Sequence, residues 1–344
     1  MVEERNLDID HEALDHYGMP PAFNTSTETQ MTEPLGVVPP VVLPMSRDGG
    51  IDSASLERHV NHLVDAGVSG LWVNGTTGEF YALDVELRAR AVRECVKATG
   101  GRVPVVAHVG DTSTDLALQH ARAAVAAGAQ HVAVLPPYFI GFGQEELKAH
   151  FRAVARVVGG PVYAYHLPQL APATLSLDSI VELVAEGVLC GAKDSSSNMV
   201  WFRQLQARLR AEGTPLPVLT GGSSVADLGY FLGAVGSVSS TGNLTPRHLV
   251  RQYQAALAED WTLVRALQEQ TEELIARLTL PGLAPSPSLT NAVYKYVLVA
   301  LGRIDDEHTA RPQALLPEPA RQHLDTHALP LVEHLESQEH PPRP

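Results

Sequence analysis

The chain has 344 residues, 44% of them hydrophobic and 19% charged, a composition that excludes a disordered protein and allows a sizeable core. Acidic residues outnumber basic ones, 39 against 25, and the net charge of −14 argues against nucleic acid as a partner. Two cysteines are too few for a disulfide framework or a zinc cluster, and the sequence has neither an apolar run of membrane-spanning length nor the basic start of a signal peptide. We therefore predict a soluble, cytoplasmic protein with no membrane or nucleic-acid partner.

Both ends of the chain differ from the rest. Residues 1–33 are rich in Asp, Glu, Thr, Asn and Pro and show no sustained periodicity, which is typical of a disordered acidic tail. Residues 337–344 end in Pro-Pro-Arg-Pro, and we expect them to be frayed for the same reason.

Short apolar runs alternate with amphipathic stretches between these two tails. Runs of this length that are hydrophobic on both sides suit strands covered on both faces, as in a parallel sheet. Eight such runs, rich in Val, Leu and Ala, are found at 37–43, 70–73, 103–109, 131–135, 161–165, 189–192, 217–219 and 236–239.

Amphipathic helix patterns separate most of these runs. Asp52 and Asp84 are in position to cap two of the helices, and Gly100 and Gly159 to end two. Strands and helices in alternation predict an α/β fold, a closed (β/α)8 TIM barrel over residues 34–244. A doubly wound open sheet is the alternative that this pattern also allows. The predicted helices cover 53–66, 84–99, 114–127, 145–158 and 177–186.

The strand signal stops after Asn243. Proline residues at 281, 285 and 287 separate the second of the following helices from the third. We predict a C-terminal helical domain over residues 245–336 as an extension of the barrel. Its helices are expected at 246–259, 261–278, 288–301 and 318–335.

Polar residues gather where the predicted strands end. The active site of a TIM barrel lies at the carboxyl ends of its strands, so these residues are the first candidates for function. Gly75 follows the second strand, Ser195 the sixth and Ser240 the eighth, and we place all three at the substrate site.

Lys193 is the most informative of these residues. It follows the apolar strand 189–192, so its amine would project from the dry interior of the barrel. Burial disfavours the charged form and lowers the pKa of a lysine, which gives a nucleophilic amine able to form a Schiff base with a ketone or aldehyde. The alternatives are an ion pair with Asp194 or Glu79, or a side chain that reaches the surface.

Tyr165 and two threonines complete the candidate site. Tyr165 ends the neighbouring strand and could move a proton beside the amine, although a tyrosine that only fills the core would look the same in the sequence. Thr76 and Thr77 offer two hydroxyls and closely spaced backbone N–H groups, which suit a small carboxylate. An ordinary turn capped by threonine is the alternative for that pair.

The order and spacing of four motifs resemble those of one family, the dihydrodipicolinate synthase/N-acetylneuraminate lyase superfamily of class I pyruvate-dependent aldolases. The resemblance extends over about residues 34–335. The motifs are Gly-Thr-Thr-Gly-Glu at 75–79, Pro-Pro-Tyr at 136–138, Tyr-His-Leu-Pro at 165–168 and Gly-Ala-Lys-Asp-Ser at 191–195.

The resemblance implies a role for each matching residue. Lys193 would form the Schiff base with pyruvate or a pyruvate-derived 2-oxo acid, and Tyr165 would transfer protons. Thr76 and Thr77 would bind the carboxylate, and the main-chain carbonyl of Val238 would face the imine. A protonated imine is itself an electron sink, so no metal and no separate cofactor are expected. The family also implies a homotetramer, a dimer of dimers, or a homodimer.

Several positions depart from the family. Leu170 stands where the synthases place an arginine that holds the carboxylate of the aldehyde substrate, and Phe139 stands where they place a second tyrosine. His166 replaces an asparagine after the catalytic tyrosine, and His108 replaces a small residue at the end of the third strand. With Phe139 and Phe142, the two histidines predict a second-substrate pocket that is bulkier and less cationic than that of the synthases.

Four functions remain open at this point. We favour a Schiff-base lyase that cleaves or forms a 2-oxo acid, with pyruvate as one partner and a neutral or bulky aldehyde as the other. A dehydratase of 2-keto-3-deoxy sugar acids would use the same lysine. A 4-hydroxy-tetrahydrodipicolinate synthase is disfavoured by Leu170 and Phe139. A catalytically silent binding protein would have no need of a buried lysine.

Overall fold

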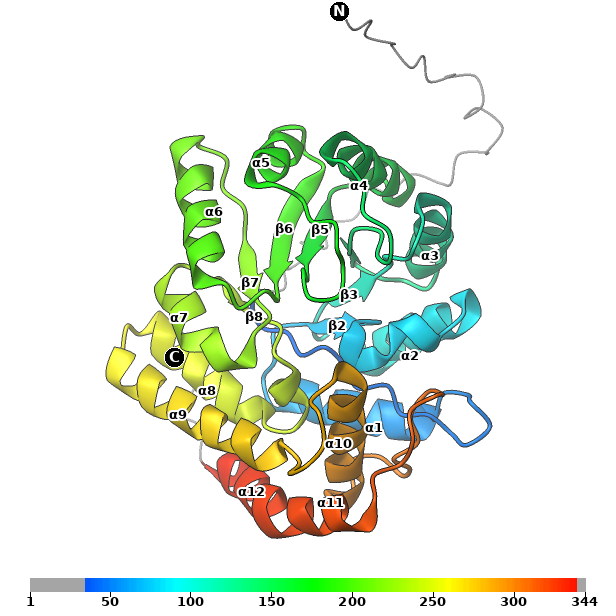
Figure 1. The fold of residues 1–344 in the computed structure, drawn as a ribbon, viewed down its shortest axis with the longest axis vertical. Coiled ribbons are helices and arrows are strands. Elements are labelled where there is room, and N and C mark those ends of the chain that lie inside the picture. The colour runs from blue at the N-terminus through cyan, green and yellow to red at the C-terminus, as the bar shows by residue number, and fades with distance from the viewer. Residues whose placement is uncertain (1–34, 339–344) are drawn as a thin grey trace, which may run out of the picture. The chain divides into compact units, whose positions relative to one another are not determined.

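The computed structural model describes residues 35–338, so the predicted tail 1–33 and residues 339–344 lie outside the described residues. Eight parallel strands, each followed by helical segments, make up one sheet in the order β1-β8-β7-β6-β5-β4-β3-β2 (Figure 1). The strands are β1 (Gly36–Val37), β2 (Leu71–Val73), β3 (Val105–His108), β4 (His131–Val134), β5 (Val162–His166), β6 (Leu189–Asp194), β7 (Val218–Thr220) and β8 (Gly236–Ser237).

The sheet closes on itself beside β1. The N–H of Val41 donates to the carbonyl of Trp72 at 2.9 Å, and the N–H of Trp72 donates to the carbonyl of Pro39 at 3.0 Å. These bonds join the chain after β1 to β2, the far edge of the strand order, in a parallel bridge. Closure confirms the (β/α)8 barrel and excludes the open doubly wound sheet.

Five helices of the barrel, α1 to α5, follow the predicted ranges closely, whereas no range was predicted for α6 and α7. Asp52 and Asp84 cap α1 and α2 by accepting from the backbone N–H groups of Ser55 and Leu87, and Gly100 ends α2 with φ of 57°. The helices are α1 (Ser53–Asp65), α2 (Val85–Thr99), α3 (Thr114–Ala126), α4 (Gln144–Val158), α5 (Leu177–Ala185), α6 (Met199–Ala211) and α7 (Ala226–Phe231).

Two predicted elements differ from the structure. The first strand was expected over 37–43, but β1 ends at Val37, because Pro39 and Pro40 have no N–H group to donate to a neighbouring strand. The last helix was expected over 318–335. It is divided into α11 (Glu318–His323) and α12 (Leu329–Ser337) by a π-helical turn at Leu324–Ala328.

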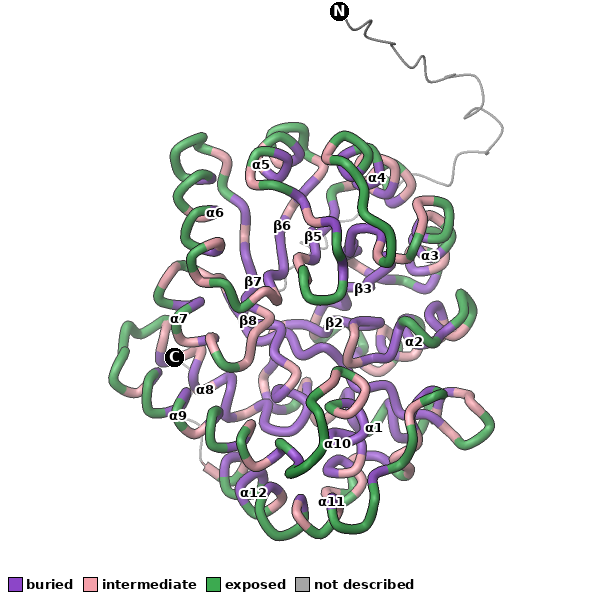
Figure 2. Tube along the Cα trace, viewed as in Figure 1, coloured by how far each residue is buried: buried purple, intermediate pink, exposed green. Residues whose placement is uncertain are grey.

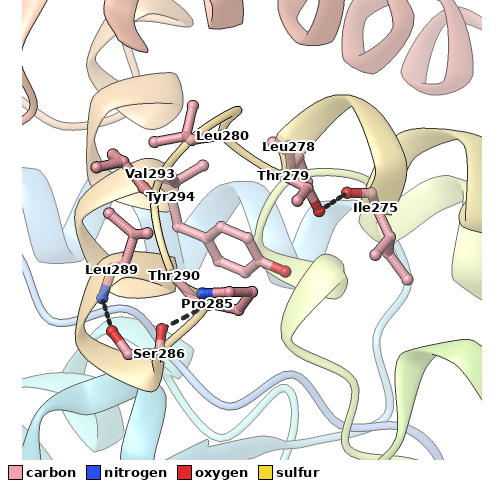
Figure 3. A pocket seen from close by; sticks show the side chains of 11 residues that line it. Ile275, Leu278, Thr279, Leu280, Pro285, Ser286, Leu289, Thr290, Val293 and Tyr294 are labelled. Carbon is pink, nitrogen blue, oxygen red and sulfur yellow. Dashed lines mark hydrogen bonds between the residues drawn. The ribbon is translucent and has the colours of Figure 1, made fainter.

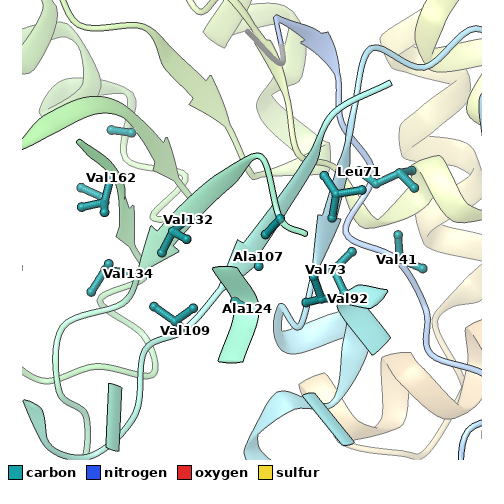
Figure 4. Close-up of a cluster of buried hydrophobic side chains, with 14 of the residues drawn as sticks. Val41, Leu71, Val73, Val92, Ala107, Val109, Ala124, Val132, Val134 and Val162 are labelled. Carbon is teal, nitrogen blue, oxygen red and sulfur yellow. The ribbon is translucent and has the colours of Figure 1, made fainter. Parts of the chain in front are cut away.

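Apolar side chains occupy both faces of the barrel wall. Val73, Ala107 and Val132 point outward and pack with residues of the surrounding helices such as Val92 and Ala124 (Figure 4). The strands are buried except at the half-buried His131, His166 and Cys190, whereas the helices carry exposed residues on their outer sides (Figure 2). The barrel interior is filled by a second cluster of buried side chains that includes Val38, Trp72, Phe80, Val106, Leu135, Tyr163, Tyr165, Leu219 and Val238.

The C-terminal helices add a third apolar cluster. They are α8 (Pro246–Leu257), α9 (Trp261–Leu278), α10 (Pro287–Ala300), α11 and α12, and they lie together on one side of the barrel (Figure 1). The cluster draws on α9 to α12, whereas Leu249 and Val250 of α8 pack in the cluster around the barrel wall. Helix α10 packs against the short 3-10 turn Thr76–Gly78 that follows β2. This contact brings residues far apart in the sequence to the carboxyl end of the barrel. Of the helices within residues 35–338, none has the length and apolar character needed to cross a membrane.

Candidate active site

Lys193 lies in the barrel interior, near the end of β6. Ala192 packs on the helix side of the strand, so alternation turns the next side chain inward, where Lys193 is only 3% exposed. Its Nζ is 4.1 Å from the centre of the Tyr165 ring and 4.8 Å from that of Trp72. Burial lowers the pKa of Lys193, and the nearby Tyr165 opposes this shift. An amine in these surroundings is neutral more often than one in water.

Lys193 neither pairs with Asp194 or Glu79 nor reaches the surface, the two alternatives that the sequence allowed. Glu79 pairs with Lys295 instead, and Asp194 accepts a hydrogen bond from the N–H of Ser196 at 2.9 Å. Within residues 35–338, Lys193 makes no ion pair with a carboxylate. The low exposure of its side chain also excludes a lysine that reaches the surface.

Gly191 explains why the two strands can place Tyr165 beside Lys193. The register pairs Tyr163 with Gly191 and Tyr165 with Lys193, after a bulge at Val162. A Cβ atom on Gly191 would lie 2.2 Å from Cε1 of Tyr163, far inside van der Waals contact. Only glycine therefore lets the Tyr163 ring cross this strand inside the barrel.

Tyr165 connects the lysine to the turn after β2. Its hydroxyl lies 3.4 Å from Oγ1 of Thr76, and its ring packs edge-on against Trp72 with ring centres 5.7 Å apart. Thr76 and Thr77 begin the 3-10 turn, so their backbone N–H groups have no partner within it. Gly78 keeps the turn close to the barrel, because a Cβ atom there would lie 3.1 Å from the carbonyl oxygen of Val41.

Glu79 anchors this turn to the C-terminal helices. It adopts a left-handed conformation with φ of 57°, and its buried carboxylate forms an ion pair with Lys295 of α10. The other carboxylate oxygen accepts a hydrogen bond from the N–H of Ala310 at 2.6 Å. Asn291, also on α10, donates its side-chain amide to the carbonyl of Thr76 at 3.0 Å. The position of the threonines therefore depends on α10.

Sequence reasoning missed Lys295 and Asn291. The signal was present for Lys295, because it is a single charged residue in the apolar stretch Ala292–Ala300 of a helix. A charge at such a position is rarely buried without a partner. The sequence did not show that the partner would be Glu79, more than two hundred residues earlier.

His108 lies inside the barrel, close to Tyr165. Its Nδ1 is 2.8 Å from the carbonyl oxygen of Asn74, so Nδ1 carries the proton and Nε2 is left as an acceptor. Burial lowers the pKa of His108 to about 3, which keeps the ring neutral. The ring packs edge-on against Phe80 and Tyr165, with centre distances of 4.6 and 5.5 Å. The structure thus brings His108 to the site.

His166 and Phe139 lie elsewhere. His166 follows Tyr165 on the strand, so its side chain turns to the opposite face, where it stacks on Trp201 with ring centres 3.9 Å apart. Burial lowers the pKa of His166 to about 4. Phe139 has a positive φ of 83° and is 84% exposed. Within this chain, neither residue faces Lys193.

The remaining candidates lie in the segments that follow β6 and β8. Val238 is buried in the interior cluster that contains Tyr165. Ser240 forms a hydrogen bond with the hydroxyl of Tyr294 at 3.1 Å, which joins the turn after β8 to α10. The N–H of Ser195 donates to the carbonyl of His166 at 2.8 Å, which holds the loop after β6 to the end of β5.

A cavity of about 680 Å³ adjoins the site at Thr76. Thr76 is the link between them, because it lines the cavity and also contacts Tyr165, whereas Lys193 and Tyr165 are not among the lining residues. None of the lining side chains is charged. They are Thr76, Phe80, Tyr81, Leu135, Tyr138, Leu170, Pro287, Ser288, Ala310, Pro312, Gln313 and Ala314.

A smaller cavity of about 110 Å³ lies between the end of α9 and the start of α10 (Figure 3). Its walls are mainly apolar side chains such as Ile275, Leu289 and Val293. Tyr294 links it to the turn after β8, through the hydrogen bond to Ser240. The part of the chain from 35 to 338 contains no group of three His, Cys, Asp or Glu side chains that could hold a metal ion.

Comparisons with known proteins agree with this geometry. The model of the dihydrodipicolinate synthetase family matches residues 33–326. An uncharacterized DapA-like lyase of Halobacterium salinarum is 36% identical over 244 residues, 71% of this chain and 79% of the relative. A 4-hydroxy-tetrahydrodipicolinate synthase of Phenylobacterium zucineum is 35% identical over 294 residues, 85% of this chain and 96% of the relative.

A solved structure has the same fold. YagE of Escherichia coli K12, a prophage protein of the dihydrodipicolinic acid synthase family solved in complex with pyruvate, superposes with a TM-score of 0.79 and 25% sequence identity. The match covers 88% of this chain and 98% of that structure. The family model extends over most of the chain, and the relatives share at least a third of the aligned residues. The chain belongs to the dihydrodipicolinate synthetase family.

Proposed function

We propose that the protein is a class I lyase that forms or cleaves a 2-oxo acid, with pyruvate as one partner held as a Schiff base on Lys193. The observation that carries this proposal is the buried amine of Lys193, which lies against the rings of Tyr165 and Trp72 and makes no ion pair within residues 35–338. Family membership supports it, because the related YagE was solved with pyruvate.

The proposed reaction begins when the neutral amine of Lys193 adds to the keto carbon of pyruvate. Loss of water gives a protonated imine, which makes the neighbouring methyl group acidic. Removal of a methyl proton gives an enamine, and its terminal carbon attacks the aldehyde carbon to form the new C–C bond. The aldehyde oxygen takes up a proton, and hydrolysis of the imine releases the product and restores the lysine. Cleavage follows the same steps in reverse.

Tyr165 and the threonine turn have separate proposed roles. The Tyr165 hydroxyl is next to Thr76 and its ring is next to the amine, so it can pass protons between the two reacting ends. The N–H groups of Thr76 and Thr77, with their hydroxyls, would bind the pyruvate carboxylate. Val238 and His108 would line the far side of the imine.

The aldehyde partner is proposed to be neutral. Leu170 lines the cavity, and the cavity has no charged side chain that could hold a second carboxylate. Burying a carboxylate without a cation or enough donors costs several kcal/mol, about a hundredfold or more in affinity. We therefore rank neutral, bulky aldehydes above aspartate semialdehyde, the carboxylate-bearing aldehyde of the synthases.

The Schiff base can be tested by trapping. Incubation with pyruvate and borohydride should add one reduced pyruvate per chain, located on Lys193 by peptide mass spectrometry. No mass increase, or an increase that persists in Lys193→Ala, would overturn the proposal. Borohydride without pyruvate is the control.

The aldehyde class can be tested with a panel. Values of kcat/KM for aspartate semialdehyde should fall below those for neutral aliphatic and aromatic aldehydes. A tenfold preference for aspartate semialdehyde, about 1.4 kcal/mol in transition-state binding, would restore the synthase assignment. Loss of water from 2-keto-3-deoxy sugar acids, with no aldol product from any aldehyde, would instead identify a dehydratase.

We also propose that the protein is a homo-oligomer, either a tetramer or a dimer. Phe139, Ile140 and Phe142 form an exposed apolar loop, 84%, 56% and 37% exposed in the single chain. A second chain would cover this loop and could bring Phe139 to a neighbouring site. Sedimentation velocity should show a dimer or tetramer, and Phe139→Asp should shift it toward the monomer.

A further inference from the structure

The cavity beside Thr76 has walls from two distant parts of the chain. One side comes from loops that follow the barrel strands, with Phe80, Tyr138 and Leu170. The other side comes from the start of α10, at Pro287 and Ser288, and from residues 310–314, a segment between α10 and α11 that no barrel strand precedes. We call residues 310–314 the C-terminal wall. The active site of a TIM barrel is expected at the carboxyl ends of its strands. That expectation did not predict that residues 310–314 would line the same cavity as the barrel loops.

The C-terminal wall is anchored to the threonine turn by the buried ion pair. The N–H of Ala310 donates to Glu79, and Glu79 directly follows the turn that carries Thr76. Lys295 pairs with the same carboxylate and donates to the carbonyl of His308 at 2.8 Å. Glu79 and Lys295 are 1% and 0% exposed, so both contacts are shielded from water. One buried pair therefore fixes both the turn and the wall.

Gln313 gives the C-terminal wall its chemical character. The other three lining residues of the wall, Ala310, Pro312 and Ala314, are small or apolar. Gln313 Nε2 donates to the carbonyl of Ala314 at 3.0 Å, while Oε1 accepts from no group within residues 35–338. An amide oxygen in this state can accept a hydrogen bond from a hydroxyl group. Because the amide is neutral, it does not favour an anion.

The size and surface of the cavity set the rest of the ligand. A cavity of about 150 Å³ already holds a benzene molecule, and this one has about 680 Å³. Phe80, Tyr81 and Tyr138 also line the cavity and offer aromatic surface to a ligand. An aromatic body would gain from packing against these rings.

We propose that the C-terminal wall determines acceptor specificity, and that Gln313 selects an uncharged aromatic aldehyde bearing a hydroxyl group. This inference rests on the proposed function, because it names the partner that reacts with the pyruvate enamine. It assigns Gln313 as a specificity residue and Glu79 with Lys295 as positioning residues. Sequence reasoning placed the entire second-substrate pocket on the barrel loops.

The test compares two aldehydes that differ by one hydroxyl group. With pyruvate as donor, kcat/KM for 4-hydroxybenzaldehyde should exceed that for benzaldehyde by about tenfold, the value of one well-placed hydrogen bond. Gln313→Leu should reduce this ratio to about one. Gln322→Leu, on an exposed face of α11, is the matched control and should leave the ratio unchanged.

Trapping separates this inference from the proposed function. Pyruvate with borohydride should label Gln313→Leu as fully as the unaltered protein, because the lysine and the threonine turn are unchanged. If labelling is normal but the ratio persists in Gln313→Leu, or neither aromatic aldehyde is turned over, the role of the C-terminal wall is wrong. If the unaltered protein is not labelled at all, the Schiff-base function itself fails.

Discussion

Lys193 and Lys295 are both buried, 3% and 0% exposed, yet their surroundings differ. Lys193 lies near the end of β6 and faces the rings of Tyr165 and Trp72. Lys295 lies within α10 and pairs with the carboxylate of Glu79. Burial lowers the pKa of both lysines, but in Lys295 the carboxylate opposes that shift. Burial alone therefore does not mark a reactive lysine, and the partner decides which role the amine can have.

Substitutions of the two lysines should affect different properties of the protein. A buried ion pair is costly to break, because the remaining partner keeps an uncompensated charge. Lys193 faces aromatic rings and has no carboxylate partner within residues 35–338, so its replacement leaves no unpaired charge there. We expect changes at Lys193 to affect turnover first and changes at Lys295 to affect folding first.

The largest expected effect is that of Lys193→Met on turnover. Loss of the nucleophile should lower kcat by about 10⁴-fold or more, because no other step replaces the imine. The melting temperature should stay equal or rise, since methionine fills the site without burying an amine. Steady-state kinetics and calorimetry on the same sample check both expectations. A large loss of stability would show that Lys193 has a structural role like that of Lys295.

The next effect is that of Lys295→Met on stability. Glu79 would be left buried without a cation, so the free energy of unfolding should fall by about 3–5 kcal/mol. Urea denaturation measures this loss. In the double variant Glu79→Gln with Lys295→Met, part of the stability should return, because no unpaired charge remains. If the double variant is no more stable than Lys295→Met, the unpaired charge of Glu79 is not the cause of the lost stability.

Tyr165→Phe should have a smaller effect, confined to activity. Removing the hydroxyl beside Thr76 should lower kcat by about 10²-fold, the usual scale for a positioned proton donor. Trapping of pyruvate on Lys193 should survive, because the amine is untouched. Unchanged turnover would mean that protons reach the enamine by another route. The buried acceptor Nε2 of His108 would then be tested by His108→Gln.

The smallest effect is a pH dependence of stability that belongs to Lys193. Its folded-state pKa lies below the ordinary value of 10.5, so the unfolded chain binds more protons between these two values. Stability contributed by this group therefore rises with pH in that interval, by at most about 1.4 kcal/mol per pH unit. The effect is isolated by measuring the unfolding free energy of the unaltered protein and of Lys193→Met at each pH and taking the difference. A difference that stays constant with pH would contradict the lowered pKa.

The placement of Lys193, Tyr165 and Thr76 near one another could be predicted, because each follows or ends a parallel strand. The carboxyl ends of parallel strands meet at one end of a barrel, so local patterns suffice to bring such residues together. The directions of the neighbouring side chains were harder to predict. His166 and Phe139 were expected at the substrate, but strand alternation turns His166 onto Trp201, and the loop conformation leaves Phe139 exposed. The alternation at His166 follows once Tyr165 is placed inside the barrel, whereas the positive φ of Phe139 has no periodic signal in the sequence.

The sequence by itself determined the eight strands, the helices between them and the lysine at the end of β6, because each depends on local periodicity and on strand order. Only the tertiary structure decided which charged side chains form buried ion pairs. The contact between Glu79 and Lys295, and the cavity that Gln313 and Leu170 both line, join segments separated by more than a hundred residues. No local pattern encodes such pairs, since they form only when α10 packs against the turn after β2. The physical reason is burial: the helix packing removes the charges of Glu79 and Lys295 from water, and each then requires the partner that the fold supplies.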